Sequence, residues 1–292
     1  MTTNNPLPLP AVAPRGAVQK TMVDAKVLSG FTDVTHFELL AGEYLATLDV
    51  TGRAQVLADA AASRAFVASL PAVPPKPVVG RPISHPHVDA IRADPLFAQT
   101  LGQTSHKFCY IDPSDVVALQ AWIEPRADVV PTDETALLEF ALPSTWDVAV
   151  EVSFVRPIGP IQILSSNPAM QGLMMELDQA SGRVMIGAPK HLNLVQVVQF
   201  NGKYFLKNGY HRVADAIAAG ITELPAIVVD ALSPSDAALL GSTVFNIGYV
   251  LGLLRPPLVR DFHSNATIPV KVRERRYGVM IGLDIKPLNI GI

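Results

Sequence analysis

Cysteine is almost absent from this chain of 292 residues, since Cys109 is the single one. One thiol can form neither a disulfide within the chain nor a cysteine-based zinc site. The lack of a disulfide framework favours a reducing compartment, and we expect a cytoplasmic protein. Cys109 lies in the apolar stretch Phe108-Cys109-Tyr110-Ile111, so we interpret it as a buried core residue.

Long hydrophobic runs are also lacking. The most apolar stretch, residues 244–254, is too short to cross a bilayer, which takes about 20 apolar residues. The first residues, MTTNNPLPLPAVAPRG, have neither the charged start nor the unbroken apolar core of a secretory signal peptide. We therefore expect no membrane-spanning segment and no membrane partner.

Charge is scarce and nearly balanced. Charged residues make up 17% of the chain, and 23 Lys and Arg against 26 Asp and Glu give a net charge of −3. A chain without an overall positive field is not typical of a nucleic-acid binder, so we do not expect nucleic acid as a partner. By contrast, 49% of the residues are hydrophobic, which supplies a sizeable core and excludes an intrinsically disordered protein.

Proline is abundant, with 25 residues, and its clusters suggest the domain organisation. Residues 1–16 are expected to form a flexible proline-rich tail. Residues 17–70 have a helical periodicity, clearest at 54–67, and are expected to form a helical extension. The proline-rich residues 71–86 cannot be a helix interior or a central strand, so we interpret them as a linker. Residues 87–292 are then the main α/β domain with a C-terminal extension.

The first part of the main domain mixes helices and strands. Residues 87–102 are typical of a helix, and residues 107–111 of a strand. Asp112-Pro113-Ser114-Asp115 has the cap, proline and acidic residue of a helix start, and it predicts a helix that continues to Trp122. Three segments follow: an acidic irregular one, a strand-like one, and a methionine-rich one for which we expect a helix (126–147, 148–164 and 168–180).

The clearest local structure lies at residues 194–229. The pattern predicts a hairpin, a glycine turn, a helix and a buried strand, in that order (195–200 with 203–206, 207–209, 210–219 and 226–229). Asn201-Gly202 is the strongest short hairpin signal, because both positions of a type I′ turn need positive φ. Gly220 is the expected stop of the helix.

The junction between the glycine turn and the helix is the candidate site. A helix N-terminus has unpaired N–H groups and a partial positive charge, so the cations His211 and Arg212 are disfavoured there unless an anion binds. We expect a phosphate at this turn, held by N–H groups from Gly209 onward and by the Arg212 fork. The candidate ligand-binding residues are Lys207, Asn208, Gly209, Tyr210, His211 and Arg212, and His211 is the candidate catalytic residue.

The same pattern fits a second interpretation. Arg212 could pair with a carboxylate of its own domain while His211 packs, and spacing alone does not decide between the two. Elsewhere, His85-Pro86-His87 has no cysteine or acidic cluster beside it, so we expect no metal site in the protein itself.

At these residues the chain resembles the ParB/sulfiredoxin-like superfamily. The resemblance is carried by Tyr204-Phe205-Leu206-Lys207-Asn208-Gly209-Tyr210-His211-Arg212, by the alanine-rich helix that ends at Gly220, and by Leu224-Pro225-Ala226. It implies a small α/β (α+β) fold whose Gly-x-x-Arg turn binds nucleotide phosphates, with Mg²⁺ accompanying a triphosphate. A weaker similarity extends to residues 108–111 and the Asp112 helix, as the opening strand and helix of the family.

The sequence also departs from the family. Sulfiredoxins have their catalytic cysteine directly before His-Arg, where this chain has Tyr210, so we do not expect sulfinic-acid repair. Partition proteins add a Glu-Asn motif and a helix-turn-helix, which residues 230–292 lack. The kinase branch needs a carboxylate near the phosphates, and Asp215 and Asp178 are candidates only in principle.

We therefore expect a cytoplasmic bacterial protein that binds a nucleotide or another phosphorylated ligand, with nucleotide hydrolysis or phosphoryl transfer as open activities. Two alternatives stay open: a non-catalytic interaction or assembly module that keeps the fold, and a ParB-like nuclease. Near the C-terminus, strand alternation places Lys271, Arg273 and Arg275 on one face. This face is either a contact for nucleic acid, a phosphate tail or an acidic protein partner, or a charged edge that discourages aggregation.

Overall fold

The computed structural model describes most of the chain between residues 22 and 281. The described residues are 22–72, 76, 78–125, 130–143, 151–154, 161–165, 174–178, 183–187, 192–233, 235, 245, 255–273 and 277–281. The expected tail at residues 1–16 lies outside them, as does most of the apolar stretch 244–254. Helices and strands are mixed throughout, so the expected α/β class is confirmed at that level.

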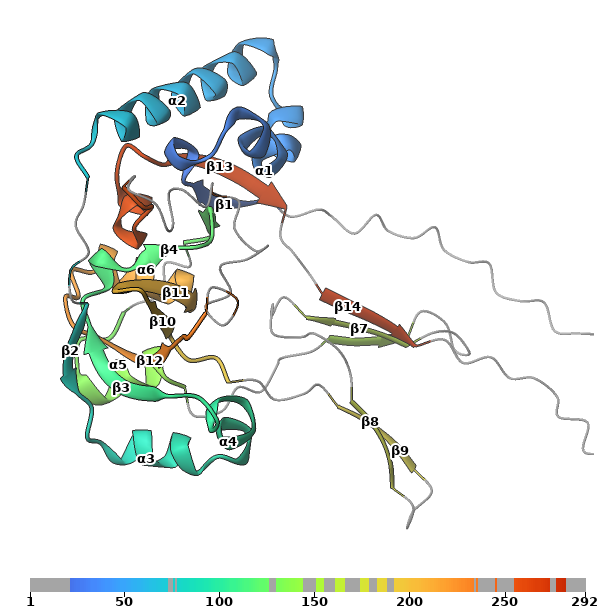
Figure 1. Cartoon of the computed structure of the whole chain (residues 1–292). Helices are drawn as coiled ribbons and strands as arrows, with labels where there is room; N and C mark the ends of the chain where they lie inside the picture. Colours follow the sequence, from blue (N-terminus) through green and yellow to red (C-terminus); the bar gives the residue numbers. More distant parts are fainter. Residues whose placement is uncertain are drawn as a thin grey trace, which may run out of the picture.

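A six-stranded sheet has the strand order β2-β3-β12-β10-β11-β4 (Figure 1). Its strands are β2 (Val79–Pro82), β3 (His106–Ile111), β4 (Val117–Ala118), β10 (Gln196–Phe200), β11 (Lys203–Asn208) and β12 (Leu224–Asp230). The expected hairpin of β10 and β11 is confirmed, since Asn201 and Gly202 have φ of 48° and 74°, both positive as a type I′ turn requires. β12 lies parallel to β10 and antiparallel to β3.

Four helices accompany this sheet. They are α3 (Pro86–Ala93), α4 (Pro95–Leu101), α5 (Glu134–Ala141) and α6 (Tyr210–Ala218). The expected helix after the glycine turn is confirmed as α6, which connects β11 to β12 and is followed by Gly220 at a φ of 76°. α5 packs against β12, and the ring of Phe97 in α4 lies 5.7 Å from that of Phe108 in β3.

A second, three-stranded sheet joins the first described strand to one that lies far along the chain. Its strands are β13 (Ile268–Arg273), β1 (Met22–Val27) and β5 (Trp122–Ile123), and helices α1 (Val34–Thr47) and α2 (Val50–Ser69) pack with it. β1 pairs with β13 along its whole length, from Met22 opposite Arg273 to Val27 opposite Ile268. The expected helical extension thus also contains a strand, and its helices share a hydrophobic core with β13.

The proline-rich segment is attached to the edge of the six-stranded sheet. β2 pairs with β3, and the Ile83 amide donates to the Phe108 carbonyl at 3.0 Å. Proline is tolerated on such an edge strand because one side of the strand needs no partner. Pro86 then begins α3, with His85 as its N-cap. Part of the segment that we expected to be a linker, Val79–Pro82, is therefore a strand.

The prediction of a helix from Asp112 to Trp122 is wrong. Asp112 does cap a turn, since its side chain accepts from the Ser114 amide at 2.9 Å, but only the 3-10 turn η2 (Pro113–Asp115) forms. The chain then extends, and Val117 pairs with Phe205 of β11. The β-branched valines at 116 and 117 suit an extended chain, and this long-range pairing overrides the helix start.

Three other expectations are corrected. The helix expected at 87–102 is two helices, because Asp94 caps a new one at Pro95 and accepts from the Leu96 amide at 2.8 Å. The acidic segment 126–147 contains α5. In the methionine-rich segment 168–180, for which we expected a helix, the described residues form the strand β8 (Met174–Asp178), which pairs with β9 (Arg183–Gly187).

One further sheet has the order β14-β7-β6, formed by β14 (Tyr277–Ile281), β7 (Ile161–Ser165) and β6 (Glu151–Phe154). The strands expected between 148 and 164 are thereby confirmed as β6 and the first part of β7. In Figure 1, this sheet and the β8–β9 pair lie to one side of the six-stranded sheet.

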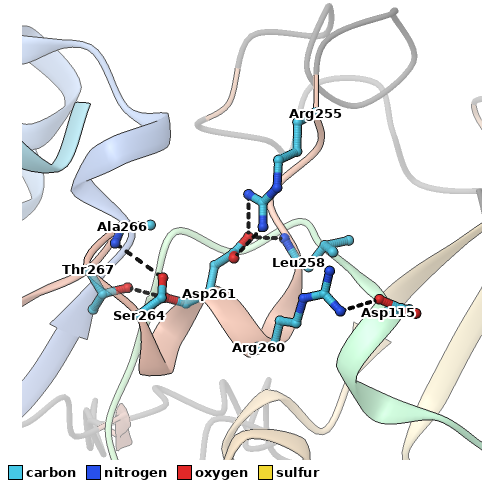
Figure 2. A network of polar contacts seen from close by, with 8 residues as sticks. All are labelled: Asp115, Arg255, Leu258, Arg260, Asp261, Ser264, Ala266 and Thr267. Carbon is cyan, nitrogen blue, oxygen red and sulfur yellow. Dashed lines mark hydrogen bonds and ion pairs between the residues drawn. The ribbon is translucent and has the colours of Figure 1, made fainter. Parts of the chain in front are cut away.

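A network of hydrogen bonds and ion pairs connects the segment before β13 to the turn after Asp112 (Figure 2). Asp261, in the turn η3 (Val259–His263), accepts two hydrogen bonds from Arg255 at 2.7 and 3.0 Å and one from the Leu258 amide at 2.8 Å. Arg260 donates to Asp115 at 2.6 Å, and Lys76 lies 3.3 Å from the same carboxylate. Asp115 is thus part of a structural network that links η2 to η3.

Candidate functional site

The turn between β11 and α6 needs glycine at position 209. Gly209 has φ of 93° and ψ of 21°, a left-handed conformation that other residues rarely adopt. A Cβ atom there would lie 2.9 Å from Cγ2 of Val195, closer than real Cβ contacts, and 3.2 Å from its Cα atom, which is tighter than most of them. Glycine is also the N-cap of α6, so no side chain at this position accepts from the first-turn N–H groups.

Tyr210 faces the protein interior. Its ring is buried, and its hydroxyl accepts from the Leu119 amide at 2.8 Å and donates to the Leu206 carbonyl. Burial raises the pKa of the phenol well above its usual range, so the hydroxyl stays protonated. Tyr210 joins β11 to the segment after β4, which is a structural role at the position where sulfiredoxins have cysteine.

Replacement of Tyr210 by phenylalanine is expected to lower the free energy of unfolding by about 1–3 kcal/mol, because the buried Leu119 amide loses its acceptor. Urea denaturation followed by circular dichroism measures this loss. Tyr44→Phe is a matched control, since Tyr44 lies partly buried against the smaller core. A Tyr210→Phe protein as stable as the wild type would contradict the role assigned to the hydroxyl.

His211 is held by the backbone of the segment after β5. Its Nδ1 atom lies 2.8 Å from the Glu124 carbonyl and 3.1 Å from the Glu124 amide. The tautomer decides which of these groups is the partner, since Nδ1 donates to the carbonyl or accepts from the amide. A proton transfer by His211 would therefore use Nε2.

Arg212 reaches the carboxyl end of another helix. Nη1 donates to the carbonyls of Phe140 and Ala141, each at 3.0 Å, and Nη2 donates to the Asn193 carbonyl at 2.6 Å. Phe140 and Ala141 are the last residues of α5, where carbonyls lack helical partners and a cation is favoured by the helix dipole. These three acceptors are neutral oxygen atoms of the backbone.

Two asparagines complete the turn. Oδ1 of Asn193 accepts from Nη2 of Arg212 at 3.0 Å and from Nδ2 of Asn208 at 3.1 Å. Oδ1 of Asn208 in turn accepts from the Gly209 amide at 2.9 Å. Lys207, by contrast, is exposed on β11. The turn thus contains the exposed cation Lys207. It also contains two side-chain donors, from Asn208 and Arg212, that point toward the amide oxygen of Asn193.

The structure adds residues that sequence reasoning missed. Asn193 lies 15 residues before Asn208, and the acceptors of Arg212 in α5 lie 71 and 72 residues before it. No spacing rule connects such distant positions. A search for polar residues just before β10 would have singled out Asn193, because it precedes the buried pair Leu194 and Val195.

The two histidines of His85-Pro86-His87 each contact a backbone group of the protein. Nδ1 of His85 accepts from the His87 amide at 3.2 Å, and Nε2 of His87 lies 2.6 Å from the Leu142 carbonyl. In the part of the chain that the structure describes, no three His, Cys, Asp or Glu side chains are grouped to hold a metal ion. Cys109 is buried as expected, and burial raises its pKa to about 11.

The basic face near the C-terminus is described only in part. The strand expected there is confirmed as β13, on which Lys271 is exposed and lies 3.8 Å from Asp24 of β1. Arg275 lies outside the described residues, and Arg273 is described as a position in the strand only. A contact of this face with an acidic partner stays a prediction.

Comparisons with protein-family models, curated proteins and solved structures return no match. The resemblance to the ParB/sulfiredoxin-like superfamily therefore stays a prediction that rests on residues 194–229. Among the described helices, none combines the length and the apolar character that a bilayer crossing requires.

Proposed function

We propose that the protein binds a phosphorylated small molecule, a nucleotide in the first place, at the turn formed by residues 207–212. The observation that carries the proposal is the convergence of donors at the start of α6. The side-chain amide of Asn208 and the guanidinium of Arg212 meet at a single acceptor atom, next to a helix N-terminus without a side-chain cap. Such a set of donors suits the oxygen atoms of a phosphate.

The roles of the residues follow from their surroundings. The Lys207 side chain is exposed to solvent and would attract the phosphate through its positive charge. Arg212, which is anchored on α5, would offer its guanidinium from a fixed position, and the N–H groups after Gly209 would complete the site. His211 is the candidate for proton transfer through Nε2. Mg²⁺ would accompany a triphosphate and be held by its phosphates.

A thermal-shift panel tests the proposal. We expect ATP, CTP or GTP with Mg²⁺ to raise the Tm of the wild type, because a ligand at 100 times its Kd stabilises the folded state by about 2.7 kcal/mol. Lys207→Ala should weaken the binding about fivefold, because an exposed phosphate–lysine contact contributes only modestly. Lys107→Ala is the matched control, since Lys107 is exposed on β3 of the same sheet, several strands away from β11.

The outcome separates the candidate functions. A Tm that is unchanged by every nucleotide, in a cooperatively unfolding sample, would count against the proposal. Equal weakening by Lys207→Ala and Lys107→Ala would show that the anion binds without using the turn. Arg212→Ala is a poor reporter, because the same side chain supports α5.

A non-catalytic interaction module is the second candidate. It is favoured by the contacts of His211 and Arg212 with backbone groups of the protein itself, which give both residues a use without any ligand. A bacterial cytoplasmic setting and a nuclease activity are further parts of the hypothesis that rest on the resemblance. Cleavage of DNA that depends on Mg²⁺ or Mn²⁺ would favour the nuclease.

A further inference from the structure

The side-chain oxygen of Asn193 lies between the two side-chain donors of the turn. It accepts from Nη2 of Arg212 at 3.0 Å and from Nδ2 of Asn208 at 3.1 Å. Both of these nitrogen groups can only donate, so the Asn193 atom that faces them acts as the acceptor. One oxygen atom therefore links the end of β11 to the first turn of α6.

A phosphate oxygen would suit the same position. It accepts from guanidinium and amide N–H groups at similar distances, and its charge makes these bonds about twice as strong as bonds between neutral groups. Asn193 is only half-buried, so its amide can turn away without opening the hydrophobic core. Its main chain would stay in place, because its carbonyl also accepts from Nη2 of Arg212 at 2.6 Å.

We propose that Asn193 is an internal substitute for the ligand, whose amide oxygen fills the acceptor position until an anionic oxygen of a phosphorylated molecule displaces it. This inference rests on the proposed function and adds a regulatory contact to it. The contact between the Asn193 oxygen and the two donors lowers the apparent affinity for the ligand. Only protein molecules in which the Asn193 side chain has turned away can bind it. Ligand affinity is then set partly by a residue that does not need to touch the ligand.

Two substitutions at this position test the inference in opposite directions. Asn193→Ala removes the competing oxygen, and we expect about tenfold tighter binding of the probe that binds the wild type. Asn193→Asp places a tethered carboxylate against Arg212, so we expect binding to be lost and the Tm to rise. The probes are inorganic phosphate and ATP, CTP and GTP with Mg²⁺, measured by isothermal titration calorimetry on the full chain.

The control is Gln199→Ala, which removes a half-buried side chain of similar polarity toward the other end of β10 and should keep the wild-type affinity. Circular dichroism checks the folding of each variant, and the Asp variant preserves the size of the side chain. Binding by the wild type with no gain in Asn193→Ala, or with full affinity in Asn193→Asp, would overturn the role of Asn193 alone. Absence of binding in both the wild type and Asn193→Ala would overturn the proposed function and the inference together.

Discussion

Replacement of Arg212 by alanine is expected to lower the free energy of unfolding by about 3 kcal/mol. The guanidinium donates to the carbonyls of Phe140, Ala141 and Asn193 and to the Asn193 amide oxygen. Without it, the end of α5 loses the cation that its dipole favours and that donates to the Phe140 and Ala141 carbonyls, of which the Ala141 carbonyl keeps its bond from the Val195 amide. Chemical denaturation with urea, monitored at a helix-sensitive wavelength, gives the difference in free energy.

Two comparisons make this result specific. Arg53→Ala removes an exposed arginine from α2 and should change the stability by no more than about 0.5 kcal/mol. Arg212→Lys keeps the charge but loses the planar fork, so it should retain only part of the stability. If Arg212→Ala were as mild as the control, the bonds to α5 would have no energetic weight, and the guanidinium would instead be available mainly to a ligand.

Asp261→Ala is the second large effect, with an expected loss of about 3–5 kcal/mol. The side chain of Asp261 is 4% exposed and that of Arg255 is 10% exposed, so the substitution leaves a buried guanidinium without its bidentate partner (Figure 2). The Leu258 amide loses its acceptor at the same time. Thermal and urea denaturation of the variant measure the loss.

The double variant Arg255→Met/Asp261→Leu is the informative companion. Removal of both charges replaces the buried pair by apolar side chains, and a large part of the lost stability should return. Asp89→Ala is the control, because its ion pair with Arg92 is exposed and should contribute little. A double variant as unstable as Asp261→Ala would contradict the explanation by an unpaired buried charge.

Local rules predicted the centre of the candidate site well. The Asn201-Gly202 turn, the α6 helix and its stop at Gly220 depend on neighbours in sequence and on positive φ, which a sequence pattern reveals. The helix expected after Asp112 failed for the opposite reason. Its start is locally correct, but the pairing of Val117 with Phe205 comes from far away in the chain and outweighs the local preference.

Arg212 interacts with the ends of two helices, and its position in the sequence reveals only one of them. A cation in the first turn of α6 is disfavoured by the dipole of that helix, and this is what suggested an anion. The structure places the guanidinium at the carboxyl end of α5, where the dipole of a different helix favours it. A sequence cannot show which second helix end lies within reach of a long side chain.

The pairing of β1 with β13 also bears on synthesis. As the chain leaves the ribosome, β1 is made first, and the partner that pairs with it along its whole length, β13, is made much later. The loop between them is long, and closing it costs conformational entropy before any strand bond compensates for it. The apolar side of α1 is therefore incompletely covered until β13 has been made, and this interval is the one in which a chaperone would have the most to protect.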